Sequence, residues 1–484
     1  MTRHGRSAQR SLGALATAAL ILAWAGPAAA AEAGGAAARV WTSSIDYFNP
    51  GTAAATLSVS YRDAAGTGVD TATVPISAGA SGSVLVGATM PPGFAGAALA
   101  SSDRPIAVLY RQQATGAATT APMLYAPFTA ARAGTGRFFV PEVRRGGAGN
   151  TVIGIQNPGS RDISLSLDFF SATSAFQKTV NLPAVKPLSS AVVNLATMGT
   201  LGTTFDGSLV IRAANTVGGA PARVLAAAET VPAAGREAYA FAGMSNAATQ
   251  VLMPAALCVP SATGTLRSLF QVQNAAKTGA RFVVAYYYPV TSGGRTTVRT
   301  ASASTGLVAP GKRVTIDPCA VAAIAGKSKV VAVISGRDAA GKASPVAALA
   351  RWVKGASGTQ YAAAALPPAV ALDAKYRVVF PAVEWGPAGT RTTVTVMNGA
   401  PKAVAVATPF PVTVSFYSQA GVLVKAVTGS VVTAASFDPS AAGALVSGVF
   451  RGAVVVESSR PIAAAAQVQQ VGYTVADGYA GIPW

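Results

Sequence analysis

The chain repeats one pattern of residues four times, at intervals of about 110 to 120 residues, which is too long for a solenoid repeat. Each copy opens with a short alternating strand and an asparagine turn, and further along it reaches a proline before an apolar strand. The turns begin at Asn49, Asn157, Asn274 and Asn398, and the prolines are Pro105, Pro221, Pro345 and Pro461. Such a period matches one self-sufficient domain. It predicts four domains in series, and their short linkers favour a semi-rigid rod.

Within each copy, apolar and small polar residues alternate along short runs separated by turn residues, as in Leu57 to Tyr61 and Val412 to Phe416. This period of two, without helical periodicity, predicts an all-β chain of immunoglobulin-like antiparallel β-sandwiches. The predicted units are residues 39–135, 136–246, 247–370 and 371–484. The first unit lacks the strand that carries Pro141, Pro254 or Pro381 in the other three, so it is expected to miss an edge strand.

Residues 1–31 predict a secretory signal peptide. Arg3, Arg6 and Arg10 precede an apolar run from Leu12 to Ala25, and alanines then supply a cleavage site near Ala30 or Ala31. The apolar run is shorter than the ~20 residues that span a bilayer, which favours cleavage over an anchor. We therefore expect a secreted or cell-surface protein without a transmembrane anchor.

The two cysteines, Cys258 and Cys319, both fall in the third unit. Because export is predicted, a disulfide between them is the expected state. Two buried free thiols are the alternative.

The single histidine, His4, lies in the predicted signal. The rest of the chain therefore has no imidazole base or ligand, which excludes Ser-His-Asp sites, Cys-His sites and histidine-containing zinc sites. The closest carboxylate pairs, Asp63 with Asp70 and Asp162 with Asp168, stand near predicted turns, where solvated Asp is ordinary. The sequence predicts neither an enzyme nor a cofactor or metal site.

Positive charge is concentrated in the third unit, which has 13 basic residues against Asp317 and Asp338, a net +11. Such a field attracts anionic polymers, so an anionic cell-wall polymer or polysaccharide is the expected partner. The alternative is that these residues only solubilise an alanine-rich surface. Lys327 and Lys329 have the spacing of two residues on one side of a strand. The six candidate contacts are Arg295, Arg299, Lys312, Arg313, Lys327 and Lys329.

Nucleic acid and neutral sugars are the other partner classes that bear on this chain. No nucleic-acid-reading motif accompanies the charge, so no dedicated nucleic-acid site is expected. Exposed aromatic side chains could stack on sugars, which makes a carbohydrate-binding protein the alternative function. The tryptophans outside the predicted signal are Trp41, Trp352, Trp385 and Trp484.

Four sequence features together form a motif set. They are the strand ending in Ile155–Gly159, the aromatic strand after it, the segment Gly93–Gly96 and the segment Ser102–Ala107. This set resembles tandem immunoglobulin-like repeats of exported bacterial surface proteins, which are mostly of unassigned function. The resemblance implies structural modules and carries no catalytic residue. The sequence therefore predicts a non-enzymatic structural or adhesive surface protein that acts through multivalent weak contacts.

Overall fold

The computed structural model describes most of the chain, and within the described residues the protein is all-β, with seven antiparallel sheets, four short 3-10 turns and no α-helix. Of the predicted signal, only residues 17–21 are described. The described ranges are 17–21, 39–86, 90, 96–116, 119–124, 136–147, 149–231, 239–244, 247–253, 255–261, 264–327, 329–354, 359–360, 375–386, 390–399, 408–445, 448–470 and 476–484.

The first unit contains two four-stranded sheets, ordered β1-β6-β3-β4 and β5-β2-β7-β8. Its strands are β1 (Thr17–Ile21), β2 (Arg39–Phe48), β3 (Ala55–Asp63), β4 (Gly68–Ile76), β5 (Ser81–Leu85), β6 (Gly96–Ser102), β7 (Ala107–Gly116) and β8 (Thr119–Leu124).

The second unit has sheets ordered β12-β11-β14-β9 and β13-β10-β15-β16. Its elements are β9 (Arg137–Arg145), β10 (Asn150–Gln156), β11 (Ile163–Ser171), β12 (Gln177–Val185), β13 (Ser190–Asn194), η2 (Leu195–Thr197), η3 (Gly199–Leu201), β14 (Phe205–Asn215), β15 (Leu225–Val231) and β16 (Tyr239–Ala242).

The third unit has sheets ordered β17-β23-β20-β21 and β18-β19-β25-β26, with β24 added to β23 and β22 added to β19. Its elements are β17 (Gln250–Met253), β18 (Cys258–Ser261), β19 (Gly264–Asn274), β20 (Ala280–Ser292), β21 (Arg295–Ser304), β22 (Arg313–Ile316), η4 (Pro318–Ala320), η5 (Ala322–Ile324), β23 (Val331–Asp338), β24 (Ala343–Ser344), β25 (Val346–Lys354) and β26 (Thr359–Gln360).

In the fourth unit, one long strand joins both layers. The first half of β32 pairs with β29 and β27, and its second half pairs with β28 and β33. The strands are β27 (Lys375–Trp385), β28 (Thr390–Asn398), β29 (Phe410–Ser418), β30 (Leu423–Val431), β31 (Ala434–Phe437), β32 (Phe450–Gln470), β33 (Ala476–Ala480) and β34 (Ile482–Pro483).

The repeated asparagine closes the same turn in the first three units. The Nδ2 group of Asn157 donates hydrogen bonds to the carbonyls of Arg161 (2.8 Å) and Val185 (2.9 Å), and Asn49 and Asn274 make the equivalent bonds. The side chain thereby ties the turn to the strand end beside it, and its Oδ1 accepts from the Gly159 amide at 2.9 Å, which forms an Asx turn. This bond explains why the sequence repeats asparagine here.

Each unit buries its own apolar core between its two layers. In the third unit, Phe270 and Val272 of β19 meet Val284 and Tyr286 of β20. Alternate residues point inward, as expected for facing sheets.

The third unit also contains the predicted disulfide. Cys258 at the start of β18 is bonded to Cys319 in η4, with their Cα atoms 5.2 Å apart. The disulfide prediction is therefore confirmed.

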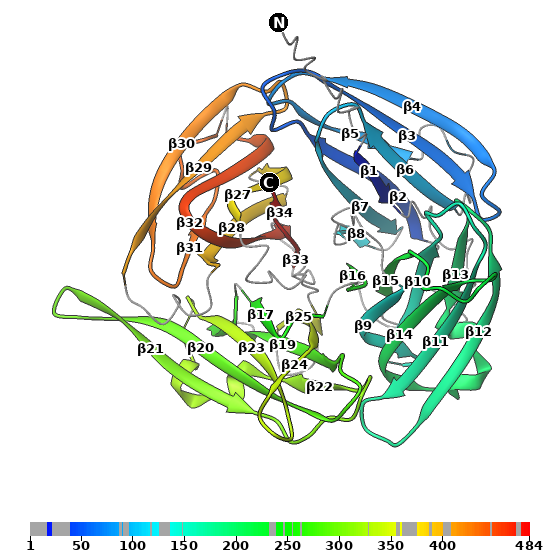
Figure 1. Cartoon of the computed structure of the whole chain (residues 1–484). Coiled ribbons are helices and arrows are strands. Elements are labelled where there is room, and N and C mark those ends of the chain that lie inside the picture. Colours follow the sequence, from blue (N-terminus) through cyan, green and yellow to red (C-terminus); the bar gives the residue numbers. More distant parts are fainter. Residues whose placement is uncertain are drawn as a thin grey trace, which may run out of the picture.

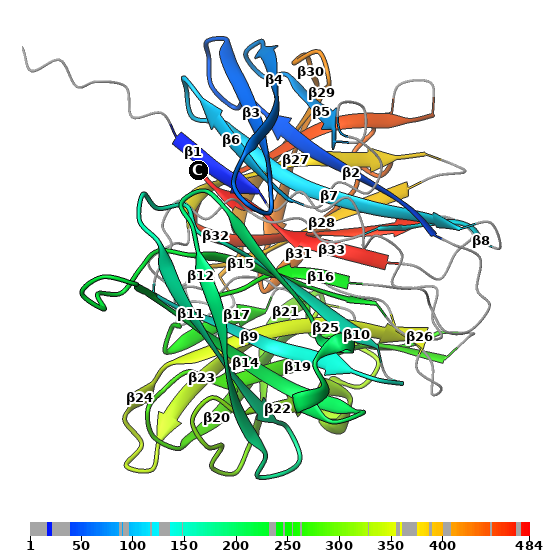
Figure 2. The same cartoon turned by 90° about the vertical axis from the view of Figure 1, so that its right-hand side faces the viewer.

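The four units form a closed ring rather than a rod. In Figure 1 the strands β1, β9, β17 and β27 lie toward the centre and β4, β12, β21 and β30 toward the rim, and Figure 2 shows the ring from the side. The first and fourth units touch directly, because Ser81 N–H donates to the Gln419 carbonyl at 3.1 Å and Phe48 packs 5.9 Å from Tyr417. The predicted rod is therefore wrong. The short linkers indicated limited flexibility, but linker length does not reveal that the first and fourth units contact each other.

Ring closure follows from one contact used head to tail. The sheet with β9 in the second unit packs on the sheet with β19 and β25 in the third, and the sheet with β27 in the fourth packs on the sheet with β2 and β7 in the first. Heterologous contacts of this kind close into a ring when the rotation per unit allows it.

Candidate anion-binding groove

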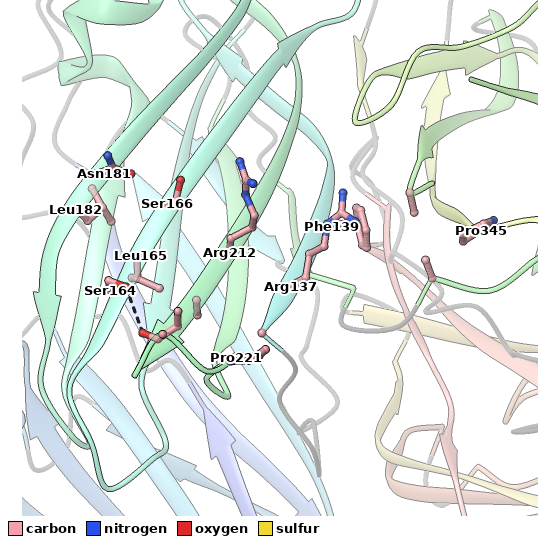
Figure 3. A pocket seen from close by; sticks show the side chains of 16 residues that line it. Arg137, Phe139, Ser164, Leu165, Ser166, Asn181, Leu182, Arg212, Pro221 and Pro345 are labelled. Atoms are coloured by element: carbon pink, nitrogen blue, oxygen red, sulfur yellow. Dashed lines mark hydrogen bonds between the residues drawn. The ribbon is translucent and has the colours of Figure 1, made fainter. Parts of the chain in front are cut away.

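A groove of about 840 Å³ lies on the outer face of the β12-β11-β14-β9 sheet, beside the third unit. Figure 3 shows Arg212 and Arg137 between Ser166 of β11 and Phe139 of β9. Ala247, Ala275 and Pro345 close the groove on the side of the third unit.

Four polar side chains form one row across this sheet. Asn181 on β12 is paired with Ser166 on β11, Ser166 with Arg212 on β14, and Arg212 with Arg137 on β9. Directly paired residues share a face of the sheet, and adjacent strands lie about 4.8 Å apart, so the row spans about 14 Å. The groove therefore offers an amide, a hydroxyl and two guanidinium groups along one line.

The two arginines of the row repel each other. Burial, together with the charge of Arg212, lowers the pKa of Arg137, and Asp168 offsets this in part. Asp168 is buried, accepts a hydrogen bond from Thr179 Oγ1 at 2.7 Å and forms an ion pair with Arg212. Arg137 also lies over the ring of Phe139, with its guanidinium carbon 4.8 Å from the ring centroid. One carboxylate thus faces two guanidinium groups, which leaves the row net positive.

The six basic residues predicted as polymer contacts do not share one face. Arg295 and Arg299 are exposed on β21, whose hairpin reaches the rim in Figure 1. Lys327 and Lys329 are exposed in the loop after η5, so the strand spacing expected for them is wrong.

The other two basic residues, Lys312 and Arg313, lie at the contact with the second unit. Lys312 Nζ donates to the Ser174 carbonyl at 2.6 Å. Arg313 is buried, forms an ion pair with Asp206 and donates to the Gly207 carbonyl at 3.0 Å. These two residues hold units together.

A buried ion-pair network joins the second and third units. Glu142 on β9 contacts Arg144 Nη2 at 2.6 Å and Arg351 Nη1 of β25 at 3.2 Å. Burial alone would raise the pKa of Glu142, but Arg351 and Arg144, with Arg313, lower it to about 2. Glu142 is therefore ionised at neutral pH, and its ion pairs hold the interface.

A second network closes the ring. Arg111 on β7 contacts Asp46 Oδ2 at 2.9 Å and Glu384 Oε1 of β27 at 3.1 Å. Burial raises the pKa of Asp46, although Arg111 and Ser83 act in the opposite direction. The adjoining cavity holds only about 20 Å³, roughly one water molecule, so this carboxylate pair has no room for a substrate.

The carboxylate pairs named from sequence are separate turn and strand residues. Asp63 accepts from the Thr67 amide at 2.8 Å and Asp70 from the Thr71 amide at 2.7 Å. Asp162 is exposed, whereas Asp168 is buried beside Arg212. Within the described ranges, no cluster of three or more His, Cys, Asp or Glu could hold a metal ion.

The tryptophans whose side chains are described are not open stacking platforms. Trp352 is buried, and Trp385 and Trp484 are half-buried, with the Arg391 guanidinium 5.2 Å from the Trp385 ring centroid. The Trp41 side chain lies outside the described residues.

Sequence reasoning missed Arg137 and Arg212, because the second unit has little net charge. Only strand register brings the two together, and register was unknown.

No helix within the described residues is long and apolar enough to cross a membrane. No protein-family model matches the chain, and a search of curated proteins finds no relative.

Proposed function

We propose that this chain is a non-catalytic, exported binding scaffold of four immunoglobulin-like units, released from residues 1–31, whose ring holds an anionic polysaccharide. The observation that carries the proposal is the row Asn181–Ser166–Arg212–Arg137. Guanidinium groups bind carboxylate, sulfate or phosphate groups through charge-assisted hydrogen bonds. The amide and hydroxyl of the same row suit sugar hydroxyls.

The rest of the molecule supports a binding role. The units of the ring are joined by a buried ion pair, Glu142–Arg351, and a half-buried one, Glu384–Arg111, so the groove sits on a rigid frame. The basic third unit borders the groove and adds an attractive field for a polyanion. The exposed β21 arginines, Arg295 and Arg299, are the rival contact.

The test compares two double variants by titration with polygalacturonate, using neutral dextran as the reference glycan. Arg137→Gln with Arg212→Gln should weaken polygalacturonate binding at least about tenfold, because two charge-assisted bonds are lost. Arg295→Gln with Arg299→Gln should change it less than about twofold, and added salt should weaken binding by the unaltered chain. A larger loss in the β21 variant would move the site to the third unit. Salt-insensitive binding of dextran would instead favour neutral carbohydrate recognition.

A further inference from the structure

The first unit takes one edge strand from the predicted signal. In the other units, β9, β17 and β27 pair with β14, β23 and the first half of β32, each of which precedes the repeated proline. The equivalent partner of β6 is β1, Thr17–Ile21, with Ile21 opposite Ala98. Among the described strands, β1 alone pairs with that edge of β6. Removal of residues 1–31 therefore exposes a row of backbone N–H and C=O groups.

Two of the equivalent edge strands also supply a charged partner to the next unit. Glu142 of β9 pairs with Arg351 of the third unit, and Glu384 of β27 pairs with Arg111 of the first. Arg111 and Arg351 occupy the same position in the repeat. Each lies four residues after an alanine, Ala107 or Ala347, and that alanine is paired with the residue just before the asparagine of the turn.

In the second unit that repeated position is Glu229, four residues after Leu225. Glu229 lies on the same face of β15 as Ala227, which packs into the core cluster of the first unit. Its side chain therefore faces the unit whose edge strand is β1.

Glu229 is buried at this interface and has no counter-charge in the described part of the chain. It is 5% exposed, its Oε1 atom lacks a hydrogen-bond partner there, and burial raises its pKa to about 8. A buried carboxylate without a partner is costly, so its presence indicates a missing group.

A second buried polar group on the same face is also unsatisfied. The Oε1 and Nε2 atoms of Gln156 lack partners among the described residues. At the next interface the equivalent residue, Gln273, donates to the carbonyls of Leu209 and Gly311 at 3.2 and 2.9 Å. At the interface between the first and second units, the side chains of Glu229 and Gln156 thus both lack partners among the described residues.

The strand that fills this edge, and the segment after it, bring no positive charge to Glu229. Residues 11–38, which include β1 and the segment before β2, contain no lysine or arginine. A different segment at this edge could carry the lysine or arginine that residues 11–38 lack.

We propose that the exported chain accepts an extended segment of another polypeptide along the free edge of β6, and that a lysine or arginine of this segment pairs with Glu229. The segment adds a strand through backbone hydrogen bonds, and its alternate side chains are apolar because they enter the core of the first unit. The inference rests on removal of residues 1–31 and is independent of the groove.

The test uses the exported chain, with its N-terminus verified by mass, and synthetic peptides of residues 15–23. In β9, Glu142 follows two residues after Val140, which lies opposite Leu209. Ile21, opposite Ala98, takes the place of Val140 in the first unit, so we expect position 23 of the peptide to take the place of Glu142 and to reach Glu229. The peptides are the unaltered sequence, the Ala23→Lys form and the Ala23→Glu form. The lysine peptide should bind at least about tenfold more tightly than the unaltered one, and the glutamate peptide more weakly.

A Glu229→Gln chain separates the contribution of the charge of Glu229 from that of strand pairing along β6. It should bind the lysine and unaltered peptides with equal affinity, and a lysine peptide with Pro in place of Leu20 should not bind because the ladder is broken. Equal binding of the lysine and glutamate peptides to the unaltered chain, or no binding of any peptide, would overturn the proposal. So would an exported chain that retains residues 1–31. None of these outcomes alters the polygalacturonate result.

Discussion

Glu142 on β9 contacts Arg351 on β25 at 3.2 Å, and this ion pair joins the second and third units through two buried side chains. The contact between Glu384 and Arg111 repeats the arrangement between the fourth and first units. In both places the acid lies on the edge strand and the arginine on the strand that follows the repeated proline. The interfaces are therefore versions of one design, and each can be tested by removing one charge.

Replacing Glu142 by Gln should destabilise the protein by about 3–5 kcal/mol, because Arg351 and Arg144 would lose the buried carboxylate that they share. Urea unfolding followed by tryptophan fluorescence measures this loss. The matched control is Glu457→Gln, whose pair with Arg377 is exposed and should matter by less than about 1 kcal/mol. Equal effects of the two substitutions would contradict the role of Glu142.

Replacing Arg111 by Gln should loosen the contact between the first and fourth units, because Asp46 and Glu384 would face each other without a cation. We expect a loss of roughly 3 kcal/mol and faster amide hydrogen exchange in β2 and β27. Exchange in β11 and β20 serves as the internal control and should not change. Uniform exchange in all four units would show that Arg111 does not close the ring.

The free energy of unfolding should depend on pH because of the Glu229 carboxyl group. Its folded-state pKa of about 8 lies above the ~4.3 of an exposed glutamate, so the folded chain binds the extra proton. Stability is fully present below about pH 4.3 and is lost as pH rises toward 8 and above. Glu229→Gln should remove this slope and stabilise the chain that retains residues 1–31 at pH 9 by roughly 2–5 kcal/mol. Thermal unfolding of both chains between pH 5 and 9 is the measurement, and parallel profiles would refute the assignment.

Removing the disulfide should affect the third unit first. A chain with Cys258→Ala and Cys319→Ala loses a cross-link spanning 61 residues, which is worth up to ~4 kcal/mol in the chain-entropy model. Hydrogen exchange should quicken in β18 and β22, while β10 and β15 of the second unit remain protected. Unchanged protection around η4 would show that packing alone holds this segment.

Local chemistry was predictable from the sequence, and long-range geometry was not. The all-β class followed from period-two alternation, the turns from repeated asparagines such as Asn157, and the disulfide from Cys258 and Cys319. The edge strand that the first unit was expected to miss is present in the structure as β1, Thr17–Ile21, so this prediction is wrong; the strand was not recognised because it lies before Arg39 in the predicted signal and carries no proline.

The ring and the groove depend on contacts between distant residues. Arg111 meets a carboxylate 273 positions away, and nothing in the local pattern of either residue encodes this pairing. Arg313 was grouped with the exposed basic residues because its charge was visible, whereas its burial against Asp206 was not. The row of Arg137 and Arg212 arises only when the register of β9 and β14 is known.

Small-angle X-ray scattering of the exported chain tests the ring most directly. A compact chain of this length has a radius of gyration of about 22 Å, and the closed ring should lie near this value. Four units in line, each about 35 Å long from the rise of its strands, would extend about 140 Å and give a radius of gyration of about 40 Å. The expected result is the compact radius, with a maximum dimension well below the length of the four units in line. The larger radius of the extended arrangement would contradict the ring.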